Sequence, residues 1–372
     1  MKIWNTGRGK RRLIGLLALF LISGCQKVTE EPKADTKAYE KYEAEFIGTF
    51  DVKIQIIGYS ESESSFENEC KIIYDKMNDL NKLFDIYNDY KGINNLKTIN
   101  DNAGIQPVKV DKEIIDLLLF SMDAYERTDG LVNVAMGSVL RIWHDHRTAG
   151  IDDPEDATIP TEAELKEAVK HTNIMDVIID EEEQTVYLAD PEMSLDVGAV
   201  AKGYSAQLAK DEAVSAGLES AVINAGGNVL TVGAPEDGTR ERWGIGIQDP
   251  KKTVDGVTNI LDTVFLNDKS VVSSGHYQRY YEVDGKVYHH IIDPKTLFPA
   301  EYFAAVSVIY ADSGTADYLS TAIFIAPYEE GVEIAKAHGA EVLWVFHDGS
   351  TKATEGYKEI SQLFSGYSSQ DE

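Results

Sequence analysis

The sequence predicts one α+β domain built on mixed, largely antiparallel sheets with flanking helices. Apolar and polar residues alternate over 50–56, as in a half-buried strand. Apolar residues over 66–84 recur at spacings of four and three, as on one face of a helix. Asp284-Gly285 separates two alternating runs, which indicates a tight hairpin. Hairpins mixed with interspersed helices favour α+β over a doubly wound parallel sheet.

The first 24 residues have the pattern of an export signal. Basic residues come first, an apolar run over 13–22 follows, and Ser23-Gly24-Cys25 ends the segment. The apolar run is too short to span a bilayer permanently. Small residues directly before a cysteine resemble a bacterial lipobox. We therefore interpret residues 1–24 as a lipoprotein signal peptide and Cys25 as the lipidated first residue of the mature chain, with a plain cleaved signal or an uncleaved anchor as alternatives. The expected location is the extracytoplasmic face of a bacterial membrane.

The chain is strongly acidic. It has 372 residues, of which 35 are Lys or Arg and 63 are Asp or Glu, and its formal charge is −28. Residues 1–24 hold five basic and no acidic residues, so the mature chain has 30 basic and 63 acidic residues, a balance of −33. This field excludes nucleic acid as a partner, and an anionic substrate would need a bound cation or a local positive site. Only Cys70 remains beside Cys25, so no intramolecular disulfide is expected.

The elements of the first half follow from local patterns. Residues 25–43 are polar and charged and are interpreted as a tether. The domain, over 44–364, opens with the strand at 50–56 and the helix at 66–84, and a second helix is expected over 111–127. A third helix starts at Thr161, where Glu164 completes a capping box. The segment before it, 145–160, is rich in Gly, Pro and Asp and is interpreted as a loop.

The second half combines short strands with two helices. A hairpin-like stretch covers 177–188, and a helix from about Ala199 to Ala216 is stopped by Gly217. A further helix is expected over 312–326, and residues 365–372 are interpreted as a flexible tail. The expected strands are 220–224, 228–233, 243–248, 262–266, the two strands of the Asp-Gly hairpin, 304–310 and 342–346.

Residues 196–203 have the features of an anion site. Asp196 ends a strand that turns through Gly198 into a helix, whose N-terminal amides favour negative charge. Lys202 adds a full positive charge one turn into the helix, and this suits phosphate. The alternative is an N-cap aspartate with a surface lysine. The paired glycines within 224–228 permit close approach of a ligand, and they fit a tight turn equally well.

Asp317 and Thr321 lie at i and i+4 of the helix over 312–326, so a carboxylate and a hydroxyl face the same way. Mg²⁺ uses one or two carboxylates, a hydroxyl or carbonyl, water and substrate phosphate. The alternative is that Asp317 merely occupies the favourable first turn and that Thr321 bonds back to the helix.

His290 stands at the end of an apolar strand. Imidazole can take a proton near neutral pH, so His290 is a candidate general base, and a satisfied core histidine is the alternative. His289 is adjacent in the strand and is expected to point to the opposite face. His144-Asp145-His146 has no third metal ligand in view and is interpreted as a loop feature.

The order of these motifs resembles that of the ApbE family, the FAD:protein FMN transferases, over roughly residues 44–346. The resemblance implies export, an α+β fold related to T-fold domains, and a cleft that binds FAD beside Mg²⁺. It implies that the FAD pyrophosphate is cut and that FMN is attached through a phosphoester to a Thr or Ser of an extracytoplasmic flavoprotein. The motifs are Thr128-Asp129-Gly130, residues 196–203, residues 224–227, Ser274-Gly275, residues 290–294 and residues 316–322.

The resemblance also implies residue roles. Asp317 and Thr321 would bind Mg²⁺ by their side chains and Ala199 by its backbone carbonyl, while Asp196 and Lys202 would contact FAD. The residues implied in catalysis are His290, as the base that activates the acceptor hydroxyl, Asp317 and Lys202, which fits phosphoryl transfer because that reaction needs charge neutralisation and positioning. The rest of the FAD pocket would consist of Tyr90, Ala135, Met136, Gly137, Gly275, His276, His290 and Ile291.

Two positions depart from the family pattern. Leu297 stands where Gly is usual after Asp-Pro-Lys-Thr, which bears on the local turn, and His276 stands where Asp is frequent after Ser-Gly, which bears on contacts with the adenine or the isoalloxazine. Two other functions remain as alternatives. One is hydrolysis of FAD to FMN and AMP, with water in place of the acceptor, and the other is flavin or solute binding by a lipoprotein without catalysis.

Overall fold

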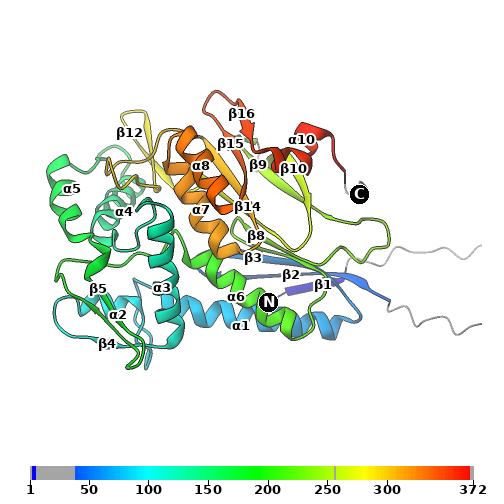
Figure 1. Cartoon of the computed structure of the whole chain (residues 1–372), viewed down its shortest axis with the longest axis horizontal. Coiled ribbons are helices and arrows are strands. Elements are labelled where there is room, and N and C mark those ends of the chain that lie inside the picture. Colours follow the sequence, from blue (N-terminus) through cyan, green and yellow to red (C-terminus); the bar gives the residue numbers. More distant parts are fainter. Residues whose placement is uncertain (1, 6–37, 255–256, 369–372) are drawn as a thin grey trace, which may run out of the picture.

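The computed structural model describes residues 2–5, 38–254 and 257–368 (Figure 1). A nine-stranded sheet forms its centre, in the order β1-β2-β3-β7-β8-β11-β14-β15-β16, and all neighbouring strands are antiparallel. The predicted α+β class with largely antiparallel sheets is confirmed. The strands of this sheet are β1 (Lys2–Asn5), β2 (Glu40–Thr49), β3 (Val52–Ser60), β7 (Ala221–Ala225), β8 (Asn228–Val232), β11 (Ser270–Gly275), β14 (Ala305–Tyr310), β15 (Glu341–Val345) and β16 (Thr351–Ala353).

Both faces of this sheet are covered. Successive side chains of a strand point to opposite faces, and β14 shows the result: Val306 and Val308 join the cluster that contains helix residues, whereas Ala305 and Ile309 join another cluster. The helices that pack on the first face are α1 (Glu63–Phe84), α6 (Ala201–Ser215) and α7 (Ser313–Ile325). The other face is covered by the hairpin β9 (Trp243–Val254) and β10 (Val257–Leu266). The central strand β14 is therefore apolar on both sides.

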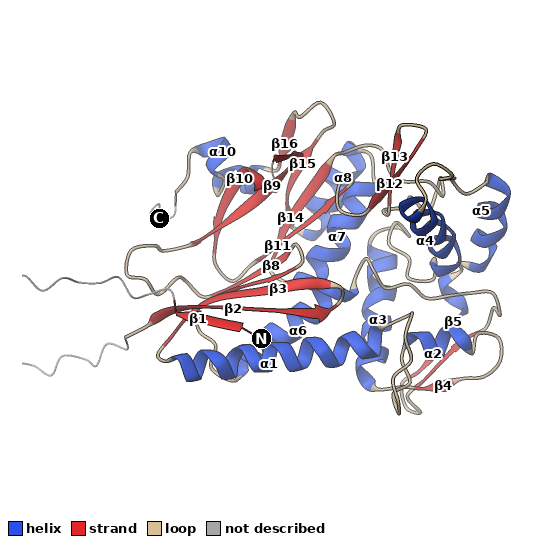
Figure 2. Cartoon of the chain, turned by 180° about the vertical axis from the view of Figure 1, so that it is seen from behind, coloured by secondary structure: helices blue, strands red, loops and turns tan. Residues whose placement is uncertain are grey.

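The remaining elements lie around the large sheet and the three helices that cover it (Figure 2). A three-stranded sheet has the order β4-β6-β5, and β12 and β13 form a two-stranded hairpin at the predicted Asp-Gly turn. These elements are β4 (Val108–Lys109), β5 (Val177–Asp180), β6 (Thr185–Leu188), β12 (Tyr280–Val283), β13 (Lys286–His289), α2 (Leu96–Asp101), α3 (Lys112–Arg127), α4 (Gly137–Asp152), α5 (Glu162–Ala168), α8 (Tyr328–His338), α9 (Glu355–Glu359), α10 (Gln362–Ser365) and two short 3₁₀ turns, Val169–His171 and Ile174–Asp176.

Two expectations were wrong at their boundaries. Residues 145–152, expected in a loop, belong to α4, because Val139 and Trp143 on this helix are buried against Leu165 and Leu297. The strand β2 begins at Glu40 rather than near residue 44, inside the segment predicted as a tether, because it pairs with β3 over its whole length.

The start of the chain is only partly described. Cys25 and most of the predicted signal peptide and tether lie outside the described residues. Lys2–Asn5, from the predicted signal peptide, pair with β2. Across the described ranges, no helix is both long enough and apolar enough to cross a membrane.

Candidate active site

Asp317 on α7 is held against the first turn of α6. Its Oδ2 accepts a hydrogen bond of 2.8 Å from the backbone N–H of Gly203, and its Oδ1 lies 3.7 Å from Lys202 Nζ. The helices approach this closely because Gly203 has no side chain. A Cβ there would lie 2.3 Å from the carbonyl oxygen of Ser313 and 2.5 Å from Asp317 Cβ. Asp317 is only 4% exposed, so its charge acts where little water screens it.

The same hydrogen bond leaves the carbonyl of Ala199 without a donor. In a continuous helix the N–H of Gly203 would donate to the carbonyl four residues earlier, which is that of Ala199. It donates to Asp317 instead. In the part of the chain that the structure describes, no other hydrogen bond reaches the Ala199 carbonyl. The departure from helical bonding therefore provides a free oxygen beside Lys202.

Thr321 lies one turn after Asp317 on α7 and is half-buried. Its hydroxyl makes no hydrogen bond with any described residue, so it does not bond back to the helix. Its neighbour Ser320 does so, because Ser320 Oγ donates to the Asp317 carbonyl at 2.8 Å and accepts from Ser274 Oγ of β11 at 2.8 Å. Ser320 thus ties α7 to the sheet, and the Thr321 hydroxyl stays available.

These groups fit a hard cation. Asp317 offers a carboxylate oxygen, Thr321 a hydroxyl and Ala199 a backbone carbonyl. The hydroxyl and the carbonyl have no hydrogen-bond partner in the described ranges. All three groups are oxygen ligands of the kind that Mg²⁺ takes. The described residues contain no group of three or more His, Cys, Asp or Glu side chains that could hold a metal. A cation here would depend on one carboxylate and on neutral oxygens. Asn228, beside Gly203, is 2% exposed, and its Nδ2 finds no acceptor among the described residues.

Asp196 is carried by a short extended segment that Asn100 of α2 fixes. Asn100 Oδ1 accepts from the N–H of Leu195 at 2.7 Å, and its Nδ2 donates to the Leu195 carbonyl at 3.1 Å. Asp196 itself is half-buried. Burial raises the pKa of its carboxyl, whereas the hydrogen bond from the N–H of Gly198 and the positive charges of Arg147 and Arg279 lower it.

The segment 134–137, which contains the predicted pocket residues Ala135, Met136 and Gly137, runs beside the Asp196 segment. The N–H of Asp196 donates to the Val134 carbonyl at 2.8 Å, and the N–H of Gly137 donates to the Ser194 carbonyl at 2.9 Å. A Cβ on Gly137 would lie 2.3 Å from the Ser194 oxygen, so glycine is required. The two side chains before it are buried, so the loop would contact a flavin through its backbone. They are Ala135 and Met136.

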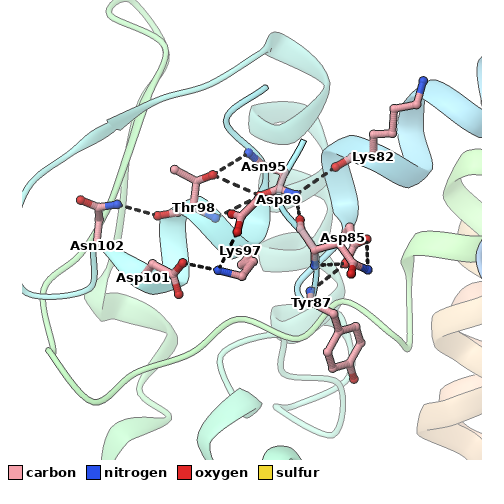
Figure 3. A network of polar contacts seen from close by, with 10 residues as sticks. Lys82, Asp85, Tyr87, Asp89, Asn95, Lys97, Thr98, Asp101 and Asn102 are labelled. Carbon is pink, nitrogen blue, oxygen red and sulfur yellow. Dashed lines mark hydrogen bonds and ion pairs between the residues drawn. The ribbon is translucent and has the colours of Figure 1, made fainter. Parts of the chain in front are cut away.

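The loop between α1 and α2 contains Tyr87, which packs against His144 of α4, and Tyr90, which bonds to Asp85. Asp85 accepts from the N–H of Tyr87 at 2.7 Å, and the buried Asn95 donates to the Lys82 carbonyl at 3.2 Å (Figure 3). Asp85 also accepts from the hydroxyl of Tyr90 at 2.8 Å. The hydroxyl of the predicted flavin residue Tyr90 is therefore engaged. Tyr87 is 59% exposed and lies over His144 of α4, with ring centres 5.5 Å apart.

The two histidines at the end of β13 have different surroundings. His289 is 6% exposed, its Nε2 lies 2.8 Å from the Ala300 carbonyl, and its Nδ1 accepts from the N–H of Ile291 at 3.2 Å. Burial lowers the pKa of His289 to about 4. His289 is the satisfied core histidine, and it packs edge-on against Phe324.

His290 is half-buried, and its Nδ1 lies 3.2 Å from the Arg279 carbonyl. A carbonyl only accepts, so Nδ1 carries the proton and Nε2 keeps the lone pair that a base needs. Burial lowers the pKa of His290 to about 3, with further contributions from the positive charges of Arg279 and Arg147. His290 is therefore unprotonated at neutral pH.

Arg147, Arg279, Tyr87 and His144 were not predicted for this site. Arg279 lies between Gly275 and the β12–β13 hairpin. The sequence alone does not indicate which residue it would contact. Arg147 follows His144 by three residues on a helix that was expected to be a loop. Recognition of that helix would have shown that His144 and Arg147, three residues apart, lie on the same face of it.

Other predicted residues have partners outside this cluster. The N–H of His276 donates to the Ala304 carbonyl at 3.2 Å, and its ring lies 5.4 Å from that of His347. Within the described residues no hydrogen bond or ion pair joins His276 to Asp317 or His290. Gly275 pairs with Ala305 in the sheet, and Ile291 is buried in the core.

The turn at Leu297 forms despite the missing glycine. Leu297 adopts a left-handed conformation with φ of 65°, and its N–H donates to the Asp293 carbonyl at 2.8 Å. Its side chain is 9% exposed, and its carbonyl accepts from Trp143 Nε1 at 2.9 Å. Burial offsets the strain of this conformation, about 1–2 kcal/mol for a residue with a Cβ.

Two cavities lie elsewhere. The larger, about 640 Å³, is lined by residues of α8, β16, α9 and α10, among them Tyr328, Lys352 and Phe364. The smaller, about 360 Å³, includes Asp129 and Lys295. None of the residues with a predicted role in catalysis or binding lines either of them, whereas Asp129, Gly130 and Pro294 of the family-like motifs line the smaller one.

The chain matches the ApbE family over residues 49–344. The FAD:protein FMN transferase of Treponema pallidum (strain Nichols) is 34% identical over 274 residues, which cover 70% of this chain and 73% of that protein. The FAD:protein FMN transferase of Vibrio cholerae serotype O1 is 26% identical over 94% of this chain and 96% of its own. The crystal structure of the ApbE protein of Thermotoga maritima aligns with a TM-score of 0.74 at 30% identity and covers 86% of this chain and 99% of that one. The match spans the Asp196, His290 and Asp317 segments, and the chain therefore belongs to the ApbE family.

Proposed function

We propose that this enzyme is a Mg²⁺-dependent FAD:protein FMN transferase that moves FMN from FAD to a Thr or Ser hydroxyl of an extracytoplasmic flavoprotein and releases AMP. The flavin transferases similar to it support the transfer. The observation that supports the cation site is that Asp317 meets the first turn of α6 beside Lys202, while the Ala199 carbonyl and the Thr321 hydroxyl have no hydrogen-bond partner among the described residues.

The reaction exchanges the phosphoanhydride bond of FAD for a phosphoester bond to the acceptor. The acceptor hydroxyl oxygen forms a bond to the FMN phosphorus, the bond from that phosphorus to the bridging oxygen breaks, and AMP leaves with that oxygen. Nε2 of His290 would take the hydroxyl proton. Lys202 would balance the negative charge on the phosphate oxygens, and Mg²⁺, when bound, would supply Lewis-acid stabilisation of the same charge. Asp317 would hold the cation, and the N–H of Gly203 fixes the orientation of its carboxylate.

The test compares the variant T321V with T315V. Both remove a threonine hydroxyl from α7, but only Thr321 faces the proposed cation. We expect T321V to need at least about tenfold more Mg²⁺ for half-maximal transfer, the loss of one ligand being worth on the order of 1–2 kcal/mol. The variant T315V should retain the wild-type requirement. Equal Mg²⁺ requirements in all three proteins would reject the cation site.

We also propose that the protein is anchored by lipid to the extracytoplasmic face of the membrane. The support is the sequence Ser23-Gly24-Cys25 after an apolar run. The acceptor would then be a protein on the same side of the membrane.

A further inference from the structure

Asn228, the first residue of β8, is a polar side chain in an apolar environment. It is 2% exposed, and its Nδ2 has no hydrogen-bond partner among the described residues. Leu230 and Val232, the next residues on the same face of the strand, pack in an apolar cluster with residues of α1 and α6. A buried amide without a partner costs free energy. An apolar residue would therefore suit this position better, unless the amide has a task there.

The amide lies under the crossing of α6 and α7. Both helices contact β8 (Figure 1). A Cβ at Gly203 of α6 would lie 3.0 Å from Asn228 Nδ2, 2.5 Å from Asp317 Cβ and 2.3 Å from the carbonyl oxygen of Ser313. These atoms surround one point, so Asn228 Nδ2 and Asp317 Cβ lie within a few ångströms of each other. The N–H of the same glycine donates to Asp317 Oδ2.

The groups around this point are hydrogen-bond acceptors. They are the carboxylate of Asp317 and the carbonyl of Ser313, while the N–H of Gly203 is already bonded to Asp317. A side-chain amide has a donor end and an acceptor end. The structure turns the donor end of Asn228 toward these acceptors. This is the favourable orientation, because the acceptor end would be repelled there.

We propose that Asn228 is a positioning residue that holds the Asp317 carboxylate in place for the cation. This inference rests on the proposed function and adds a residue of the sheet to its cation site. No direct hydrogen bond joins the two side chains in the described chain. The amide acts through its dipole, whose positive NH₂ end lies beside the buried carboxylate, where little water screens the charge.

A neutral donor suits this task better than a second cationic side chain. The positive group already near Asp317 is Lys202, whose Nζ lies 3.7 Å from Oδ1. A bound cation would repel this lysine and draw the carboxylate away from α6. Asn228 carries no net charge, so it does not compete with the cation for the charge of Asp317. Partners of this kind fix the orientation of a metal ligand.

A purely structural role would have a different signature. Replacement of an unpartnered buried polar group by an apolar group of similar shape is nearly neutral or stabilising. We therefore expect N228L to unfold at the same urea concentration as the wild type or at a higher one. The cost of the variant should appear in cation binding instead.

The first experiment measures Mn²⁺ binding to the full chain by electron paramagnetic resonance, without FAD. We expect N228L to bind Mn²⁺ about tenfold to hundredfold more weakly, the range for partners of a metal ligand. The KM for FAD at saturating Mg²⁺ should stay unchanged. The matched control is S205A, because Ser205 is 0% exposed on α6, has no partner for its Oγ in the described ranges, and lies on another side of the helix than Gly203. Wild-type Mn²⁺ affinity in N228L, or an equal loss in S205A, would overturn the proposal.

The second experiment needs no cation. It measures hydrogen exchange of the Gly203 N–H by NMR, since this group is bonded to Asp317. Exchange should be faster in N228A than in the wild type and slower in N228S, which keeps a donor hydroxyl, than in N228A. The variant S205A should exchange like the wild type. This pair of small residues also serves if N228L does not fold. Equal exchange in the wild type and N228A contradicts the positioning role.

The two proposals fail in different ways. A wild-type protein that binds no Mn²⁺ would reject the cation site of the proposed function, while exchange of the Gly203 N–H would still test Asn228. Mg²⁺-dependent transfer by the wild type, together with wild-type Mn²⁺ affinity in N228L and N228A, would reject the role of Asn228 alone.

Discussion

At the scale of residues, His289 and His290 separate stability from catalysis. In H289N the Ala300 carbonyl and the N–H of Ile291 lose their partners, so we expect unfolding to become easier by about 1–3 kcal/mol. In H290N the fold should persist, while transfer falls on the order of 10²–10⁴-fold, since a general base is lost. Urea unfolding and the transfer rate measure the two effects. Full transfer activity in H290N would remove the base from the account.

Glu69 makes stability depend on pH. It is 7% exposed, and burial raises its pKa from 4.5 to about 7, opposed by hydrogen bonds with Ser65 and Ser60. The folded state therefore binds this proton more tightly than the unfolded state. The stabilisation is fully present below pH 4.5 and is lost as the pH rises through 7.

The variant E69Q should lack this dependence. Between pH 5 and pH 8 the wild type should lose up to about 3 kcal/mol more unfolding free energy than E69Q. This follows because a pKa difference of one between the folded and unfolded states corresponds to about 1.4 kcal/mol. Urea unfolding at the two pH values measures the difference. Parallel losses in both proteins would show that Glu69 is not the titrating group.

At the scale of elements, the close crossing of α6 and α7 should control the proposed cation site. In G203A the new methyl group would clash with the Ser313 carbonyl and with Asp317, so the helices must separate. Overpacking of this kind costs about 1–3 kcal/mol. We expect G203A to remain folded but to need much more Mg²⁺ for transfer. If G203A has the wild-type Mg²⁺ requirement, the close approach of the two helices has no functional role.

Local patterns predicted those elements whose signals are local. The helix α1, the hairpin β12–β13 and most strands of the large sheet follow from periodicity and turn residues. The helix α4 was missed, since its stability comes from burial of Trp143 against distant residues rather than from a regular apolar stripe. The same limit applied to the site. Asp317 and Thr321 share one helix and could be paired from spacing, whereas Asp317 and Gly203 meet only through the contact between α6 and α7.

At the scale of the whole molecule, anchoring and catalysis should be separable. In C25S the lipid cannot be attached, so the protein should leave the membrane fraction, since a diacylglyceryl unit gives stable anchoring. The proposed catalytic groups lie between Asp196 and Thr321, far along the chain from Cys25. We therefore expect purified C25S to transfer FMN at the wild-type rate to a soluble acceptor. Wild-type protein that is already soluble in cell fractions would refute the lipobox interpretation.

The central claim is that the whole chain transfers FMN to protein through a cation site at Asp317. The measurement is the intact mass of an extracytoplasmic flavoprotein after incubation with the purified chain and FAD, with Mg²⁺ or with excess EDTA. We predict an increase by one FMN unit with Mg²⁺, equimolar release of AMP, and no increase with EDTA or with D317A. AMP release without any increase in acceptor mass would make the protein a hydrolase, and an undiminished increase with EDTA or D317A would contradict the cation site.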